Sequence, residues 1–215
     1  SYTKLHDQYD NVHGCIRISA IAKEITKHRY FQRLKDIHQL GPLHFKFPYA
    51  DHSRFEHSIG VAYLARHACT QLRGKHPEIT DREVLCVEIA GLCHDLGHGA
   101  YSHSFDHLMR ELNITDHMAH HEARSQLLTR KVIEDLNKSG VTDIPNEDIE
   151  LIEYFIDTDK FMQLHNKKPV FFSGLEQIVS NPVHKVDVDK MDYLLRDAQA
   201  LRFDQTLKYT LDIVG

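Results

Sequence analysis

Apolar residues along this 215-residue chain recur mostly with the three- and four-residue spacing of amphipathic helices. A capping box at 53–56, serine followed three positions later by glutamate, predicts a helix over about 54–73. A second capping box at 80–83 opens the stretch 84–93, which is apolar on nearly every side except at Glu88 and therefore predicts a central helix. Further helices are predicted at about 104–113, 120–138, 146–157 and 187–200.

Strand signals are few in this sequence. Only the segment 43–47, just before Pro48, alternates weakly between apolar and polar residues, which predicts a short hairpin there at most. The predicted class is therefore all-α, a helical bundle with at most a short β-hairpin. A chain of this length can bury one sizeable core, so we expect residues 1–215 to form one domain.

Composition narrows the setting in which the protein works. The net charge of −5 disfavours a protein that mainly coats nucleic acid. The basic stretch 23–35 has interleaved aromatic residues and is interpreted as a solvated helix face. The alternative is that it holds a nucleotide phosphate or a nucleic-acid backbone, which leaves nucleic acid as a secondary partner. Because we find neither a membrane-length apolar run nor a leader pattern, we expect an intracellular protein, nuclear or cytoplasmic, with no membrane partner. The four cysteines lie in no CxxC spacing and are expected to be reduced core residues.

Two histidines and two carboxylates suggest a buried metal site. His94 and Asp95 are adjacent at the end of the apolar helix, and Gly97 supplies the exit that lets both side chains reach one ion. His57 lies on the inward stripe of the first turn of the helix at 54–73, and Asp189 lies in the last predicted helix. Such mixed nitrogen and oxygen ligation suits iron, manganese or zinc, and a metal-bound water would hydrolyse a phosphoester or phosphoanhydride.

The last predicted helix presents Asp189, Tyr193 and Asp197 at four-residue spacing, with Lys190 beside the first of them. This pattern suits a metal ion bridged to a phosphate chain, with the lysine and the tyrosine holding phosphate oxygens. An exposed amphipathic helix with paired charges is the alternative.

A histidine and a carboxylate one helical turn apart follow the metal doublet. His103 and Asp106 are that pair, and His121 stands at the start of the next helix. A carboxylate that fixes the tautomer of an imidazole favours a general acid for a leaving oxygen. A capping or buried structural histidine is the alternative. Arg54, three residues before His57, is a candidate for binding a phosphate at the same site. The alternative is a solvated arginine in the first turn of its helix.

These motifs resemble those of the HD-domain phosphohydrolases, with His57, His94-Asp95 and Asp189 as the H…HD…D pattern. The sequences around 54–58, 90–103 and 186–193 most closely resemble the SAM-and-HD-domain deoxynucleoside triphosphate (dNTP) triphosphohydrolases of animals, and the likeness extends over about 10–197. The resemblance implies hydrolysis of a dNTP to the deoxynucleoside and inorganic triphosphate, with magnesium accompanying the substrate triphosphate. It also implies that the four pattern residues hold the metal.

The resemblance assigns roles to further positions. It implies that His103 is the general acid, supported by Asp106 and His121. It implies phosphate contacts from Arg54, His98, Lys190 and Tyr193, and sugar contacts from Gln39, Leu40 and Asp197. Because an apolar wall penalises a hydroxyl that it cannot pair, Leu40 beside the sugar would exclude ribonucleotides.

The chain departs from this family in three respects. It has no SAM module, and it stops at Gly215, where the family continues into a second helical lobe that supplies much of the oligomer interface. Gln32 and Arg33 match the family's regulatory guanine-nucleotide site, whereas Lys35 and Lys27 do not. Since a lysine cannot accept hydrogen bonds from a guanine edge, we expect no conventional activation by GTP. A homo-oligomer, dimer or tetramer, is the expected assembly.

Two other functions stay open. One is an HD phosphohydrolase acting on another nucleotide, which Lys190 and Tyr193 disfavour because a monophosphate gives them nothing to hold. The other is a catalytically silent binding or assembly module, against which the intact set of metal ligands argues, since unpaired buried polar groups are costly.

Overall fold

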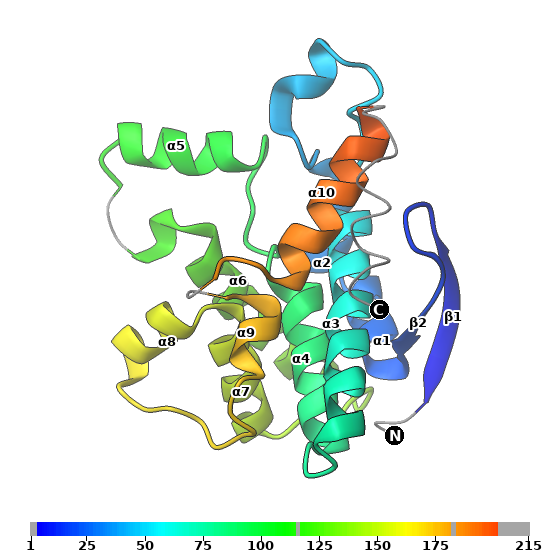
Figure 1. Cartoon of the computed structure of the whole chain (residues 1–215). Coiled ribbons are helices and arrows are strands. Elements are labelled where there is room, and N and C mark those ends of the chain that lie inside the picture. Colours follow the sequence, from blue (N-terminus) through cyan, green and yellow to red (C-terminus); the bar gives the residue numbers. More distant parts are fainter. Residues whose placement is uncertain (1–3, 115–116, 182–183, 202–215) are drawn as a thin grey trace.

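Two long helices, α3 (Arg54–Lys75) and α4 (Asp81–Cys93), pack together at the centre of the structure (Figure 1). The computed structural model describes residues 4–114, 117–181 and 184–201. The helices α7 (Asn146–Ile156) and α6 (His121–Lys138) pack beside α4, while α10 (Val188–Ala200) crosses α3 near its N-terminal end. The N-terminal ends of α3 and α10 and the C-terminal end of α4 therefore meet, and these are the ends that carry the candidate metal ligands.

Smaller elements surround this centre. They are the strands β1 (Leu5–Asp10) and β2 (Gly14–Ser19), the helices α1 (Ala20–Lys27), α2 (Arg29–Gln32), α5 (His103–Glu111), α8 (Thr158–His165) and α9 (Glu176–Val179), and the 3₁₀ helices η1 (Arg33–Asp36), η2 (Gly41–Phe45) and η3 (His117–Ala119). The predicted all-α class with one short hairpin is confirmed.

Both predicted capping boxes are present. The backbone N–H of Ser53 donates to Glu56 over 2.8 Å at the start of α3, and the backbone N–H of Thr80 donates to Glu83 over 2.8 Å before α4. Satisfying the first backbone donors of each helix fixes where it begins. The start of α3 in turn fixes the depth at which its first turn enters the core.

The central position predicted for α4 is confirmed, because all its residues from Glu83 to Cys93 are buried. Glu88 is buried with its partners: its carboxylate accepts the backbone N–H of Ser19 over 2.7 Å and pairs with Arg66 over 2.9 Å. Burial raises the pKa of Glu88 even so, and these two contacts limit that rise.

Two expectations from the sequence are wrong. The segment 43–47 is no hairpin, because η2, whose second residue is Pro42, occupies most of it. The hairpin is instead β1 with β2, paired antiparallel from Leu5 opposite Ser19 to Asp10 opposite Gly14. Cys15 on β2 is exposed rather than a core residue, whereas Cys69, Cys86 and Cys93 are buried thiols. Within the part of the chain that the structure describes, no helix is both long and apolar enough to cross a bilayer.

Candidate metal and catalytic site

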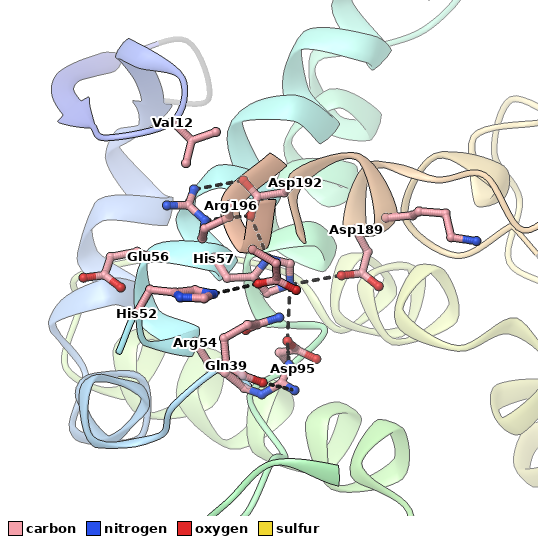
Figure 2. Close-up of polar contacts among 12 residues, drawn as sticks. Val12, Gln39, His52, Arg54, Glu56, His57, Asp95, Asp189, Asp192 and Arg196 are labelled. Atoms are coloured by element: carbon pink, nitrogen blue, oxygen red, sulfur yellow. Dashed lines mark hydrogen bonds and ion pairs between the residues drawn. The ribbon is translucent and has the colours of Figure 1, made fainter. Parts of the chain in front are cut away.

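The structure brings the four candidate metal ligands together at the meeting point of three helices. Figure 2 shows three of them, His57, Asp95 and Asp189. Nε2 of His57 lies 3.0 Å from Oδ1 of Asp189 and 3.4 Å from Oδ2 of Asp95. Nε2 of His94 lies 3.3 Å and 3.5 Å from the same two oxygens. His57 comes from the first turn of α3, the His94-Asp95 pair from the end of α4, and Asp189 from the first turn of α10.

The donor set fits a divalent metal ion. The Nε2 atoms of His57 and His94 are buried without a hydrogen-bond partner. Each ring uses its other nitrogen: Nδ1 of His57 contacts Asp192 at 2.7 Å, and Nδ1 of His94 contacts the carbonyl of Gly91 at 2.7 Å. The Nε2 atoms of both rings are therefore available to bind a metal ion together with the facing carboxylates.

The electrostatics of the cluster also favour a cation. Burial lowers the pKa of His57, but its contacts with the surrounding carboxylates outweigh burial and raise that pKa well above the usual value. Burial raises the pKa of Asp95, but the charge of Arg54 and the neighbouring histidines outweigh burial and hold that pKa well below its usual value. Positive charge is therefore stabilised where the four side chains converge.

A second cluster lies beside the first and contains the candidate general acid. His98, His103, Asp106 and His121 offer ligand or proton-transfer atoms within 4.8 Å of one another. Nδ1 of His121 contacts Oδ2 of Asp106 at 2.7 Å, and Arg124 pairs with the other carboxylate oxygen. Because both oxygens of Asp106 are engaged, this cluster suits a proton relay better than a cation.

The three histidine rings of this second cluster pack against one another, and burial shifts the pKa values of two of them. The ring of His98 stacks on that of His121 with centroids 3.9 Å apart, and the ring of His103 meets both edge-on. Burial lowers the pKa of His98 to about 3, so this ring is neutral. Burial and the charges of Arg54 and His121 also lower the pKa of His103.

A cavity of about 320 Å³ opens onto both clusters. Among the candidate substrate residues, its lining includes Gln39, Leu40, Arg54, Tyr193 and Asp197. Oε1 of Gln39 is buried without a partner, as expected of a group that binds a ligand, and His52 holds Asp197 through a 2.7 Å contact.

The other candidate substrate residues have different surroundings. His98 is buried behind the cavity wall, and Nζ of Lys190 donates to the carbonyl of Lys185 over 3.0 Å. Neither residue is part of the cavity lining. Arg54 does line the cavity, but it is buried and turned inward, pairing with Asp95 and donating to Ser102 over 2.8 Å. In this geometry Arg54 orients a candidate metal ligand.

The candidate regulatory residues lie away from the cavity and are engaged within the protein. The Gln32 amide donates to the carbonyl of Thr26. Arg33 donates to the carbonyls of His98 and Leu96. Nζ of Lys35 lies 4.8 Å from the ring centre of Phe55.

Asp192 is an important residue that the sequence patterns did not single out. It lies three residues after Asp189 and four before Arg196, its carboxylate is fully buried, and it contacts Nδ1 of His57. The spacing to Arg196 was a visible signal for an intrahelical ion pair, but the contact with α3 was not.

Comparison with known proteins places these residues in a wider group. The family model described as the HD domain matches residues 54–197. A bovine protein named deoxynucleoside triphosphate triphosphohydrolase SAMHD1 is 39% identical over 93% of this chain, and a chicken protein of the same name is 42% identical over 93%. A Dictyostelium discoideum homologue is 39% identical over 89% of the chain. The chain spans about a third of the length of these relatives, between 34% and 36%.

Proposed function

Because the chain belongs to the HD-domain family, we propose that it hydrolyses deoxynucleoside triphosphates to the deoxynucleoside and inorganic triphosphate. The observation that carries the proposal is the convergence of two unpartnered imidazole nitrogens and two carboxylates beside a histidine relay, in one cavity. The printed names of the relatives support the substrate class. The candidate assignments of individual residues below are part of the proposal.

The candidate ligands His57, His94, Asp95 and Asp189 would hold iron, manganese or zinc, with magnesium accompanying the substrate. When bound, such a metal would activate water for attack on the α-phosphorus. Arg54 holds Asp95 in the orientation that its ligand role requires. Tyr193, Lys190 and His98 are the proposed phosphate contacts, for which the lysine must leave its present carbonyl partner.

His103 is the proposed proton donor. In this reaction an oxygen–phosphorus bond would form from the attacking water, which would lose a proton to solvent. The bond from the α-phosphorus to the 5′-oxygen would break, and that oxygen would take a proton from His103. Asp106 and His121 orient the relay through their 2.7 Å contact. The pKa of His103 is lowered in the free protein, but a bound triphosphate brings negative charge that raises it toward the value that an acid needs.

The sugar end of the cavity has the polarity that a deoxyribose requires. Gln39 and Asp197 are the proposed partners of the 3′-hydroxyl, and Leu40 is the proposed apolar wall at the 2′ position. A site that offers no partner to a 2′-hydroxyl discriminates against ribonucleotides through the unpaired group.

The test is release of inorganic triphosphate from each dNTP, with Mn²⁺, Fe²⁺ or Mg²⁺ supplied. We expect turnover by the wild type, none by Asp95→Ala, and wild-type turnover by Asp7→Ala, whose carboxylate is exposed on the hairpin. Turnover of a nucleoside monophosphate or a cyclic nucleotide, with none of a dNTP, would instead favour a phosphohydrolase acting on another nucleotide. Metal binding without turnover of any nucleotide would favour the silent binding or assembly module.

We also propose that GTP does not activate the protein in the family's usual way. Lys27 carries a cation where a guanine edge needs an acceptor, and it is paired with Glu24 on the surface. The donors of Gln32 and Arg33 are occupied by backbone carbonyls. Titrating GTP into a dNTP hydrolysis assay should leave the rate nearly flat, and a steep rise would overturn this proposal.

A further inference from the structure

A buried carboxylate connects the metal ligands with the N-terminal hairpin. Asp192 of α10 is fully buried, and its Oδ2 contacts Nδ1 of His57 at 2.7 Å (Figure 2). Its Oδ1 contacts Nε2 of His13 at 2.6 Å, in the loop between β1 and β2. Arg196 donates to both oxygens, over 2.8 Å from Nε and 2.9 Å from Nη2. The carboxylate therefore has four donors on two oxygens and little freedom to turn.

The hairpin loop is shaped to present His13. Oδ1 of Asp10 accepts the backbone N–H groups of Val12 and His13 over 2.8 Å and 2.9 Å, which closes the loop as an Asx turn. Oδ2 of Asp10 accepts from Arg196 over 3.0 Å. The same arginine therefore fixes both the loop and the carboxylate that the loop contacts.

Helix α3 approaches Asp192 closely at Gly60, which follows His57 by less than one helical turn. A Cβ atom at position 60 would lie 1.9 Å from Oδ1 of Asp192 and 2.5 Å from Nη2 of Arg196. The carboxylate can thus reach His57 only because position 60 carries no side chain.

We propose that Asp192 and His13 are positioning residues of the metal centre, and that docking of the hairpin loop holds His57 in the tautomer and orientation that metal binding needs. With Nδ1–H directed at Asp192, Nε2 is left as the lone pair facing Asp95 and Asp189. A carboxylate behind a ligand histidine fixes the ring and raises its basicity. This inference rests on the metal site of the proposed function and assigns part of that site to the N-terminal hairpin.

The first test is the affinity for Mn²⁺ alone, measured by calorimetry without nucleotide. Asp192→Asn and Gly60→Ala should each weaken Mn²⁺ binding about ten- to a hundredfold. Gly74→Ala, in the same helix with open space around its Cβ position, is the matched control and should bind as the wild type does. Alanine has a higher helix propensity than glycine, so both substitutions favour the helix. Weaker Mn²⁺ binding by Gly60→Ala alone therefore does not result from a weakened helix.

The second test separates positioning by the loop from stability of the hairpin. His13→Ala should weaken Mn²⁺ binding about tenfold, whereas His13→Gln, which restores an N–H donor of similar reach, should recover most of that loss. Arg17→Ala changes an exposed residue of the same hairpin and should have no effect. Recovery by glutamine is a result that a purely structural role of the ring would not give.

The outcomes distinguish this inference from the proposed function. Folded His13→Ala and Gly60→Ala variants that bind Mn²⁺ as tightly as the wild type would overturn the positioning role, whether or not dNTPs are hydrolysed. Wild-type protein that binds Mn²⁺ with the expected dependence on Asp192 and His13, yet hydrolyses no dNTP, would support the inference while the proposed function fails. Wild-type protein that binds no Mn²⁺ would overturn both.

Discussion

Single residues decide which groups of the site carry charge, and Asp106 shows how. Burial raises the pKa of Asp106, but its contacts with His121 and Arg124 outweigh burial and hold that pKa below the usual value. An acid whose pKa is lowered on folding stabilises the protein above its unfolded pKa, near 4, and this contribution is lost as the pH falls through the folded value. The relay is therefore anchored by a carboxylate that stays ionised across the neutral range.

Replacing that carboxylate by an amide should have a pH-dependent cost. We expect Asp106→Asn to lower the free energy of unfolding by about 1 to 3 kcal/mol at pH 7, because two charge-assisted contacts are weakened. The difference from wild type should narrow as the pH falls below about 4. Urea unfolding of both proteins at several pH values measures it, with Asp143→Asn at an exposed position as control. A gap that stays constant down to pH 2.5 would contradict this assignment.

Substitution of His103, the candidate general acid, should affect turnover without affecting metal binding. His103→Gln should lower kcat about 10²- to 10⁴-fold, the usual contribution of a positioned general acid. Mn²⁺ affinity should stay at the wild-type value, because His103 belongs to the cluster with His98, Asp106 and His121 and is not one of the four candidate metal ligands. Ser104→Ala, at the neighbouring exposed position, is the control. A fall in kcat of less than tenfold would remove His103 from the role of acid.

At the scale of elements, the site depends on how the end of α4 meets the start of α6. Arg33 donates to the carbonyls of Leu96 and His98, and Arg124 donates to that of Gly97 over 2.8 Å. These carbonyls belong to the turn that follows α4, where backbone acceptors have no helical partner and need other donors. These contacts hold the segment that connects the metal doublet to His98 against the helix that carries His121.

Close backbone packing at Gly97 gives the corresponding prediction. A Cβ there would lie 2.2 Å from the carbonyl oxygen of His121 and 2.4 Å from the backbone nitrogen of Ser125, and backbone atoms cannot move aside cheaply. Gly97→Ala should therefore destabilise the protein by about 1 to 3 kcal/mol and lower kcat, since α6 must shift relative to Asp95. Urea unfolding and turnover of Gly97→Ala should be compared with those of Gly74→Ala, and equal stability of the two variants would contradict the packing argument.

Local sequence patterns predicted the helices that carry the four candidate metal ligands. The features that these patterns missed depend mostly on long-range contacts. The capping boxes at Ser53 and Thr80 located the starts of α3 and α4, because a helix start is written in adjacent residues. The strand β2 left a signal that was missed, buried Ile16 and Ile18 alternating with exposed neighbours. The contact of His13 with Asp192 joins positions 179 residues apart, and no local pattern contains it.

Across the whole molecule, the candidate metal centre is where three parts of the chain are joined. The candidate ligands come from α3, α4 and α10, so one bound ion would tie the centre of the bundle to a helix that crosses its end. Metal binding should therefore stabilise the whole fold as well as supply the chemistry.

The last prediction measures that coupling. Mn²⁺ at about one hundred times its Kd should stabilise the wild type by about 2.7 kcal/mol. For a domain of this size that corresponds to a rise in Tm of about 5 to 10 °C, which EDTA should reverse. Asp189→Ala should lose the rise yet keep a Tm near that of the metal-free wild type, because the Asp189 side chain is 35% exposed and its removal leaves little buried space. Thermal scans with and without Mn²⁺ measure this change in Tm. An unchanged Mn²⁺-dependent rise in the Tm of Asp189→Ala would exclude α10 from the metal site and would show that Mn²⁺ binding does not stabilise the packing of that helix.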